Sequence, residues 1–183
     1  MPHLPSKPQI AASRWARIKL FAMDVDGILT DGTVLVSSDG SEAKAFSVID
    51  GLGLARLRDH GVVLAWISGR LSGASTKRAE ELRIAHLIQG RHDKATALKE
   101  LTTGLGLARD EFCYMGDDDI DVGAMLLSGI GISVPTGMPA AQAAADYITS
   151  LPAGRGAVRE VCNLILQAQG VIPAHTTPAP GRG

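Results

Sequence analysis

The amino-acid sequence predicts an α/β fold with a Rossmann-like parallel sheet and helices on both faces. The first observation behind this prediction is a series of short apolar runs, most of them followed by acidic, hydroxyl or glycine residues. The second is that the segments between these runs carry apolar residues at helical spacing. Strands that alternate with helices form parallel sheets whose two faces the helices cover. The length of 183 residues fits one domain with a single core.

The apolar runs are taken as strands, because continuous runs of this length are typical of strands that are buried on both faces. The predicted strands are Ile18–Val25, Val62–Ile67, Phe112–Met115, Gly129–Val134 and Tyr147–Ile148. The predicted helices between and after them are Gly53–His60, Ala74–Leu82, Lys94–Leu105, Asp121–Ser128, Pro139–Ala145 and Ala157–Gln169.

One segment breaks this alternation. In Gly32–Phe46, the turn-forming tripeptide Ser38–Gly40 stands between two β-prone arms, which predicts a hairpin. Three prolines among the first eight residues predict a flexible leader over 1–17, and the sequence after 170 predicts a flexible tail over 171–183. The domain itself is therefore expected to span 18–170.

The composition excludes several classes of protein. A formal net charge of −1 is no basic footprint, so nucleic acid is not expected as a partner. No apolar run approaches the roughly 18 residues of a membrane span, and the N-terminal residues lack the apolar stretch of a signal peptide. Cys113 and Cys162 are too few for a disulfide framework and are expected to be reduced core residues, as Trp15 and Trp66 are expected to be packing residues. A cytoplasmic protein is predicted.

Polar residues follow the predicted strands, and in open α/β sheets ligands bind beyond the carboxyl ends of the strands. The first strand leads to Asp24, Asp26 and Gly27, and the second leads to Ser68-Gly69-Arg70. A pair of aspartates spaced this way is more often a solvated turn than a site. Because the preceding run is apolar, however, Asp24 is expected at a buried strand edge, where an ionised carboxylate needs a cation or hydrogen-bond donors.

The third strand leads to Gly116 and then to four carboxylates within five residues, which are Asp117, Asp118, Asp119 and Asp121. Alone, this cluster would fit a negatively charged surface cap on a helix. Together with Asp24 it predicts a site for a hard cation. Oxygen ligands without a nearby histidine favour Mg²⁺ over Zn²⁺.

Lys94 is predicted to begin a helix, where the helix dipole disfavours a cation, so a bound phosphate would resolve the conflict. Ser68 and the Gly69 amide add neutral donors for the same anion, although Ser68 also fits a helix cap and Lys94 also fits a surface lysine.

Other candidate motifs are weaker. Gly51-Leu52-Gly53 lacks the third glycine of a dinucleotide-binding loop because Arg56 stands there. His86 and His92 are candidates for a place near the site, although the sequence favours surface or capping roles for them.

These motifs occur together in an order that resembles a known superfamily. The segment Asp24–Thr30, then Ser68, then Lys94, then Gly116–Asp121 is similar to the four signatures of the haloacid dehalogenase superfamily. Further likeness is to its capless 3-deoxy-manno-octulosonate 8-phosphate phosphatases, and it lies in Lys44–Phe46, Asp50–Gly51, Gln89–Gly90 and Gly154–Glu160. The resemblance covers about Ile18 to Gly170 and implies a capless fold with a protruding β-hairpin.

The resemblance also implies catalytic roles. Asp24 would attack phosphorus and form an aspartyl phosphate, and Asp26 would act first as general acid and then as general base. Asp24, the Asp26 carbonyl and Asp117 would bind Mg²⁺, supported by Asp118 and Asp121. Ser68, Gly69 and Lys94 would bind the phosphoryl oxygens.

Substrate contacts and an assembly follow from the same resemblance. The contacts beyond the phosphoryl site would be Ser47, Val48, Ile49, Asp50, Gly51, Ala55, Arg70 and Arg78, together with Asp26 and Lys94. Two arginines, Arg70 and Arg78, suit a sugar carboxylate. The implied protein is a homotetramer joined through the hairpin Gly32–Phe46, with a role in lipopolysaccharide biosynthesis.

The chain departs from the family pattern at Ile49 and Ala55, where relatives that act on the octulosonate often carry arginine. A nonulosonate phosphate or another sugar phosphate is therefore an alternative substrate. A non-catalytic sugar-phosphate-binding oligomer, a phosphoacceptor receiver domain and a phosphosugar mutase are alternatives from other classes. The receiver would have no use for Asp26, and the mutase normally needs a cap domain, for which no insert is long enough.

Overall fold

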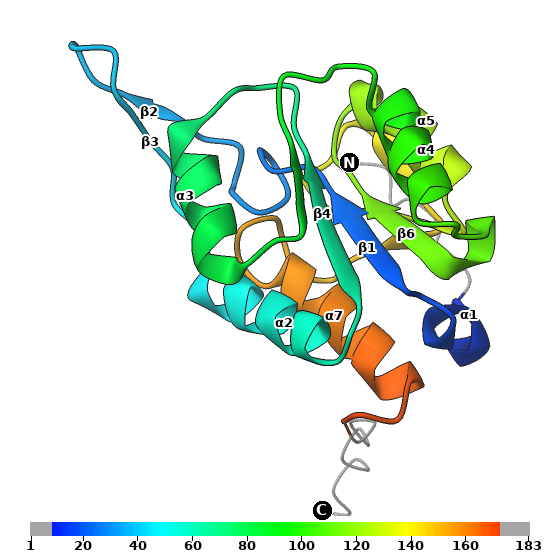
Figure 1. The fold of residues 1–183 in the computed structure, drawn as a ribbon. Helices are drawn as coiled ribbons and strands as arrows, with labels where there is room; N and C mark the ends of the chain where they lie inside the picture. The colour runs from blue at the N-terminus through cyan, green and yellow to red at the C-terminus, as the bar shows by residue number, and fades with distance from the viewer. Residues whose placement is uncertain (1–8, 173–183) are drawn as a thin grey trace, which may run out of the picture.

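The computed structural model describes residues 9–172, which form a six-stranded parallel sheet between two layers of helices (Figure 1). The strands, in chain order, are β1 (Leu20–Met23), β4 (Val63–Ile67), β5 (His86–Ile88), β6 (Phe112–Met115), β7 (Ile130–Ser133) and β8 (Tyr147–Ile148). Their order across the sheet is β5-β4-β1-β6-β7-β8, and every neighbouring pair is parallel. The predicted α/β class is confirmed.

The chain builds one half of the sheet from β1 through β4 to β5 and then crosses to the other side of β1 to add β6, β7 and β8. Leu20 of β1 is in register with Val63 of β4 on one side and with Phe112 of β6 on the other. The order therefore reverses beside β1, and the carboxyl ends of β1 and β6 flank the crevice where such sheets bind ligands.

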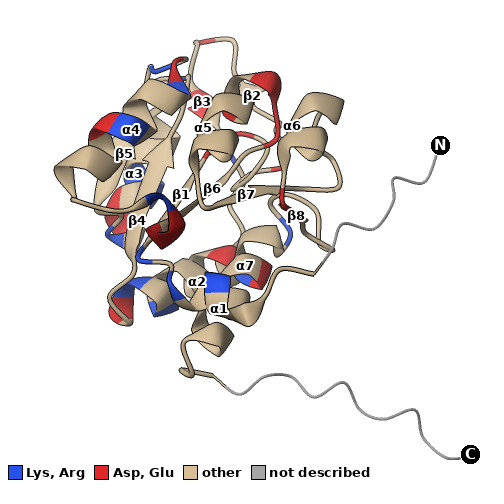
Figure 2. Ribbon diagram, turned by 90° about the vertical axis from the view of Figure 1, so that its right-hand side faces the viewer, with Lys and Arg blue, Asp and Glu red and all other residues tan. Residues whose placement is uncertain are grey.

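The helices cover both faces because alternate strand residues point in opposite directions. Phe21 and Met23 pack in the core beneath α1 (Ala12–Ala16), α2 (Val48–Asp59), α3 (Gly73–Leu82) and α7 (Ala157–Ala168). Leu20 and Ala22 pack against the opposite layer, which consists of α4 (Lys94–Gly104), α5 (Val122–Leu127) and α6 (Pro139–Ala144). Figure 2 shows α1, α2 and α7 on one side of the strands and α4, α5 and α6 on the other.

The predicted hairpin is present and projects from the body of the molecule (Figure 1). Its strands β2 (Leu35–Val36) and β3 (Glu42–Ala43) are antiparallel, with Leu35 opposite Ala43. The turn between them includes Gly40, whose φ of +82° suits glycine.

Several element boundaries differ from the prediction. Strand β5 was not expected, because its three half-buried residues do not form an apolar run. Helix α2 begins at Val48 rather than Gly53, since the Ser47 hydroxyl accepts a hydrogen bond from Asp50 N at 3.2 Å and caps the helix there. A short 3₁₀ turn over Asp119–Asp121 precedes α5, and another over Arg109–Glu111 precedes β6.

The flexible leader predicted over 1–17 is wrong for its second half. Helix α1 lies within it, and Trp15 is buried and meets the ring of Tyr147 edge-on at a centroid distance of 5.7 Å. This burial of a large aromatic side chain anchors the helix to the core. Residues 1–8 lie outside the described part of the chain, as do 173–183 of the predicted tail, whereas Ile172 packs against the core.

The expected packing residues are in the core. Cys113 and Cys162 are buried free thiols, and burial raises the pKa of both. Trp66 is fully buried and stacks on Phe46. Within residues 9–172, no helix combines the length and the apolar character needed to cross a membrane.

Candidate active site

The polar residues predicted at the strand ends converge on one small cavity of about 170 Å³ at the carboxyl edge of the sheet. Its walls come from the ends of β1, β4 and β6 and from the start of α4. The lining residues are Asp24, Asp26, Ser68, Gly69, Arg70, His92, Lys94, Asp117, Asp118 and Ile120.

A buried lysine is held between two carboxylates at the floor of this site. Lys94 Nζ lies 2.8 Å from Asp24 Oδ2 and 2.8 Å from Asp121 Oδ1, and the Lys94 side chain is fully buried. Both aspartates thereby offset the unfavourable position of a cation at the first residue of α4. The Asp24 oxygen Oδ1 also accepts a hydrogen bond from Val25 N at 2.7 Å.

Asp121 supports the site from beneath and has no free oxygen to offer. Its Oδ1 also accepts a hydrogen bond from the Tyr114 hydroxyl at 2.7 Å, and its Oδ2 accepts bonds from the amides of Asp117 and Asp118 at 3.3 and 3.2 Å. A carboxylate held by four donors is a rigid anchor for the loop after β6. The supporting role that the family resemblance implies for Asp121 in metal binding stays a prediction.

Asp117 is the residue that suits a metal ion. Its Oδ1 is buried and has no hydrogen-bond partner among residues 9–172, and oxygen atoms of Asp24, Asp117 and Asp121 lie within 4.8 Å of one another. Its side chain lies against Gly27, where a Cβ atom would collide with the carboxylate, and Gly27 has a φ of +87°. An unpartnered buried carboxylate oxygen beside Asp24 is what a Mg²⁺ site would leave, so the residues present fit this ion.

The raised pKa values of two aspartates also favour a bound cation. Burial, together with the charge of Asp121, raises the pKa of Asp24 to about 7, although Lys94 opposes the shift. Burial and the charges of Asp24 and Asp121 raise the pKa of Asp117 to about 7 as well. These buried anions repel one another, and a divalent cation between Asp24 and Asp117 would remove this cost.

Asp26 is directed to a different partner from Asp24. The chain turns directly after β1, with Leu29 N donating to Val25 O at 2.9 Å, and this turn separates the two carboxylates. Asp26 then meets Lys44, whose Nζ lies 2.6 Å from Oδ1 and 2.9 Å from Oδ2. Lys44 follows β3 of the hairpin. In the sequence it stands out only as the first residue of the family motif Lys44–Phe46. Its contact with Asp26 joins residues 18 positions apart, which no local pattern indicates.

The phosphate-binding candidates stand at the end of β4. Ser68 is buried, and its hydroxyl accepts a hydrogen bond from Arg70 N at 3.2 Å. His92 lies beside them, because a Cβ built on Gly69 would be 2.9 Å from His92 Nδ1. Of the two places that the sequence left open for His92, the structure shows the one near the site, since His92 lines the cavity. His86 instead belongs to β5, outside the cavity lining.

The remaining substrate-binding candidates divide into two groups. Arg70 lines the cavity, and its guanidinium contacts Glu42 at 3.1 Å and approaches Asp26 at 3.8 Å. Arg78 lies behind the start of α2, where its Nη2 donates to Ser47 O at 3.3 Å and its Nη1 contacts Glu81 at 2.8 Å. Its guanidinium lies so close to Gly51 that a Cβ atom there would require the guanidinium to move.

The first turn of α2 holds the other candidates, none of which lines the cavity. Val48 and Ile49 are strongly exposed, at 79% and 61%, and Ala55 is half-buried. Asp50 is buried, and its oxygens accept hydrogen bonds from Gly156 N at 3.1 Å and Arg159 N at 2.8 Å. Its carboxylate therefore caps the start of α7 and is not available to a substrate in this arrangement.

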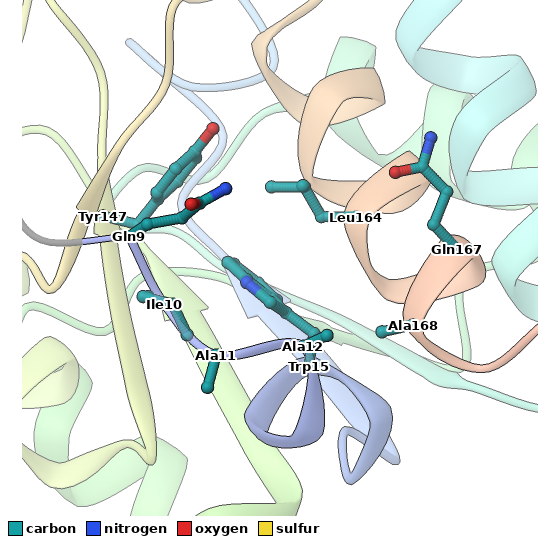
Figure 3. A pocket seen from close by; sticks show the side chains of 9 residues that line it. All are labelled: Gln9, Ile10, Ala11, Ala12, Trp15, Tyr147, Leu164, Gln167 and Ala168. Atoms are coloured by element: carbon teal, nitrogen blue, oxygen red, sulfur yellow. The ribbon is translucent and has the colours of Figure 1, made fainter. Parts of the chain in front are cut away.

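A second cavity, of about 470 Å³, opens between α1, β8 and α7 (Figure 3). Figure 3 shows Trp15, Tyr147 and Leu164 around it. Its lining is mostly apolar and includes none of the aspartates or lysines described above. The smaller cavity, where charged and hydroxyl side chains meet, is therefore the candidate active site.

Comparisons with known proteins identify the relatives of this chain. Residues 64–160 match the family model of haloacid dehalogenase-like hydrolases. The 3-deoxy-D-manno-octulosonate 8-phosphate phosphatase of Salmonella typhimurium is 38% identical over 171 residues, which cover 93% of this chain and 87% of the relative. The enzyme of the same name from Yersinia pestis is 40% identical over 163 residues, covering 89% of this chain and 87% of the relative.

The fold matches solved structures of the same group. The phosphatase of that name from Moraxella catarrhalis, crystallised with a magnesium ion, a phosphate ion and a KDO molecule, is 52% identical and superposes with a TM-score of 0.85. The match covers 87% of this chain and 91% of that one. The four motifs meet at one edge of the sheet, and these relatives match most of the length of the chain. The chain therefore belongs to the 3-deoxy-D-manno-octulosonate 8-phosphate phosphatase family of haloacid dehalogenase-like hydrolases.

Proposed function

We propose that this chain is a Mg²⁺-dependent phosphatase that hydrolyses 3-deoxy-D-manno-octulosonate 8-phosphate, in the cytoplasm, for lipopolysaccharide biosynthesis. The observation that carries the proposal is the contact of Lys94 with Asp24 beside the unpartnered oxygen of Asp117. A nucleophile, a fixed cation and a place for a metal ion are thereby present within one cavity. The named relatives supply the substrate class.

In the first step, a carboxylate oxygen of Asp24 attacks phosphorus and forms an aspartyl phosphate. Asp26 protonates the oxygen of the departing sugar, which would otherwise leave as an unstable alkoxide. Lys94, Ser68 and Gly69 line the cavity, and they would bind the phosphoryl oxygens and stabilise the charge that these carry in the transition state.

In the second step, Asp26 acts in the opposite direction. It is then a carboxylate and removes a proton from the water that attacks phosphorus, so that phosphate is released and Asp24 is restored. Asp24, the backbone carbonyl of Asp26 and Asp117 would hold Mg²⁺, with Asp118 and Asp121 in support. Bound there, the ion neutralises charge on the phosphoryl group and on the two carboxylates.

The sugar extends beyond the cavity of a single protomer. A volume of about 170 Å³ is below the roughly 300–1,000 Å³ of pockets that enclose a small-molecule ligand. Arg70 at the cavity mouth suits the sugar carboxylate. Arg78, Ser47, Val48, Ile49 and Gly51 at the start of α2, and Ala55 would contribute further contacts to the sugar, whereas the Asp50 carboxylate is held at the start of α7.

A homotetramer joined through the hairpin Gly32–Phe46 would supply the missing cover. Leu35 and Val36 on β2 are 66% and 70% exposed, and Leu71 near the cavity mouth is 78% exposed. Apolar side chains exposed on a projecting two-stranded hairpin favour burial against another subunit.

Phosphate release from a panel of substrates tests this proposal. The panel contains the 8-phosphate of the octulosonate, a nonulosonate phosphate and hexose phosphates, each with and without Mg²⁺ and beside Asp24→Asn. We expect Mg²⁺-dependent release with the highest kcat/KM for the octulosonate. A higher kcat/KM for the nonulosonate phosphate would mean that this sugar is the substrate, with the same mechanism. Tight binding of all of them without release would show a sugar-phosphate-binding oligomer instead.

A further inference from the structure

The lysine that follows β3 reaches from the hairpin into the active site. The Lys44 side chain has no exposed surface, and its ammonium contacts both carboxylate oxygens of Asp26, at 2.6 and 2.9 Å. The same ammonium donates a hydrogen bond to Ser75 Oγ at 3.3 Å. A buried ammonium is costly unless it is paired and hydrogen-bonded, and Asp26 and Ser75 together meet that requirement.

A second set of contacts holds this part of the hairpin in place. Glu42, two residues before Lys44, pairs with Arg70 at 3.1 Å and accepts a hydrogen bond from the Ser72 hydroxyl. The Ser72 hydroxyl in turn accepts a hydrogen bond from Ser75 N at 3.2 Å and caps α3. The base of the hairpin is therefore fixed to the first turn of α3, and Lys44 has little freedom to follow a moving Asp26.

This geometry bears on the proton transfer assigned to Asp26. The carboxylate lines the cavity, and the Lys44 ammonium donates a hydrogen bond to its Oδ2, while Oδ1 is in ionic contact with the same ammonium but accepts no hydrogen bond from the described residues. The rotation of the carboxylate decides which of its oxygens is open to a substrate. A general acid must lie within hydrogen-bond reach of the leaving oxygen at the right angle, so the rotation of this group matters to the rate.

We propose that Lys44 is the positioning residue for Asp26: its ammonium clamps both carboxylate oxygens and aims the carboxyl group at the leaving oxygen of the substrate. The inference rests on the proposed function, since it concerns the acid step of that reaction. When Asp26 gives its proton to the sugar oxygen it becomes a carboxylate, and the Lys44 ammonium then stabilises the new charge. In the hydrolytic step, the same carboxylate accepts a proton from the attacking water, so Asp26 is protonated again for the next cycle.

The experiment compares two leaving groups in Lys44→Met, which keeps the length of the side chain and removes its charge. Departure of a sugar alkoxide needs a proton, whereas p-nitrophenolate is stable enough to leave without one. We compare kcat/KM, which covers only the steps up to departure of the leaving group and leaves out the hydrolytic step that both substrates share. On the sugar-acid phosphate we expect it to fall at least about ten-fold, and by no more than the roughly 10²- to 10⁴-fold contribution of general acid catalysis. On p-nitrophenyl phosphate, a step that needs no acid, we expect a loss of less than about three-fold. An equal loss on both substrates would overturn the inference.

Two further variants separate positioning from folding. Lys77→Met removes an exposed lysine of α3 that pairs only with Glu80, and it should leave both activities unchanged. In the double variant Asp26→Asn with Lys44→Met, the sugar-phosphate activity should fall no further than in Asp26→Asn alone, because Lys44 acts through Asp26. Additive losses would contradict this.

Lys44→Gln, which keeps a donor of shorter reach, serves if Lys44→Met does not fold, and it should show the same selective loss on the sugar substrate. If the unmodified protein releases no phosphate from any substrate, the proposed function fails. If the unmodified protein is active, Asp26→Asn is impaired and both Lys44 variants are fully active on the sugar-acid phosphate, only the present inference fails.

Discussion

The ammonium of Lys94 lies 2.8 Å from the carboxylate of Asp24, although 70 positions of the chain separate the two residues. Asp24 ends β1 and Lys94 begins α4, so the contact depends on the order of strands in the sheet. Both side chains are buried, and neither charge would be tolerated there without the other. The pair therefore links the stability of the sheet edge to the chemistry that we propose for it.

Removing the Lys94 ammonium is expected to lower both the stability of the fold and the rate of phosphate release. Lys94→Met leaves Asp24 and Asp121 buried without their shared partner, and breaking a buried pair in this way costs about 3–5 kcal/mol. We expect a lower free energy of unfolding in urea and a loss of turnover. Lys99→Met, on an exposed position of the same helix, is the matched control. Unchanged kcat/KM in Lys94→Met would contradict the role of Lys94.

Removing the nucleophile is expected to affect only the chemistry. Asp24→Asn keeps the size of the side chain and an oxygen that can accept from Val25 N, so the fold should remain. An amide oxygen is a poor nucleophile for phosphorus, and no aspartyl phosphate can form at this residue. We expect turnover below detection in phosphate-release assays, with an unchanged far-ultraviolet circular dichroism spectrum. Turnover near that of the unmodified protein would contradict the assignment.

Mg²⁺ is expected to stabilise the protein more at pH 8 than at pH 5. The pKa values of Asp24 and Asp117 are raised from 3.8 to about 7, so between these limits the folded chain binds more protons than the unfolded one. The contribution of these two groups to stability therefore falls as pH rises through this window. Mg²⁺ binds the ionised carboxylates and opposes the loss.

The measurement is the difference in Tm with and without Mg²⁺ at the two pH values, which cancels the titration of groups far from the metal. Asp117→Asn should reduce the Mg²⁺-induced shift at pH 8, because it removes the unpartnered oxygen that suits the ion. A shift of equal size at pH 5 and pH 8 would count against this metal site.

The hairpin is expected to control the oligomeric state. Leu35→Glu combined with Val36→Glu replaces the exposed apolar side chains on the two sides of β2 with charges, so burial of this strand against another subunit would become unfavourable. We expect a smaller particle in multi-angle light scattering. Leu126→Glu, at an apolar position that is 58% exposed on α5, is the control and should keep the mass of the unmodified protein. An unchanged particle mass in the double variant would show that the hairpin does not form the interface.

Much of the site was predictable because its residues follow strands that local patterns reveal. Apolar runs ending at Asp24, Ser68 and Gly116 place these positions at the carboxyl edge of a parallel sheet, and the structure brings Asp24, Ser68 and Asp117 to one cavity. The alternation of strands and helices likewise predicted the two helix layers, since each helix must bury its apolar side against the sheet.

Contacts between distant segments were not predictable in the same way. His92 lies on Gly69 because the loop before α4 passes over the end of β4, and Asp50 caps α7, more than 100 residues away. Three half-buried residues form β5 only because the edge of β4 offers its hydrogen-bonding groups. Local pattern says nothing about such partners.

By itself, the sequence determined the fold class, the strands that carry the site and the chemical character of the cavity, because hydrophobic periodicity and residue type are local properties. Only the tertiary structure decided that Lys44 faces Asp26, that Asp121 is a saturated support while Asp117 keeps an unpartnered oxygen, and that Trp15 anchors α1. Each of these outcomes depends on which buried polar or aromatic groups meet when the layers close, and that is a property of the packed chain as a whole.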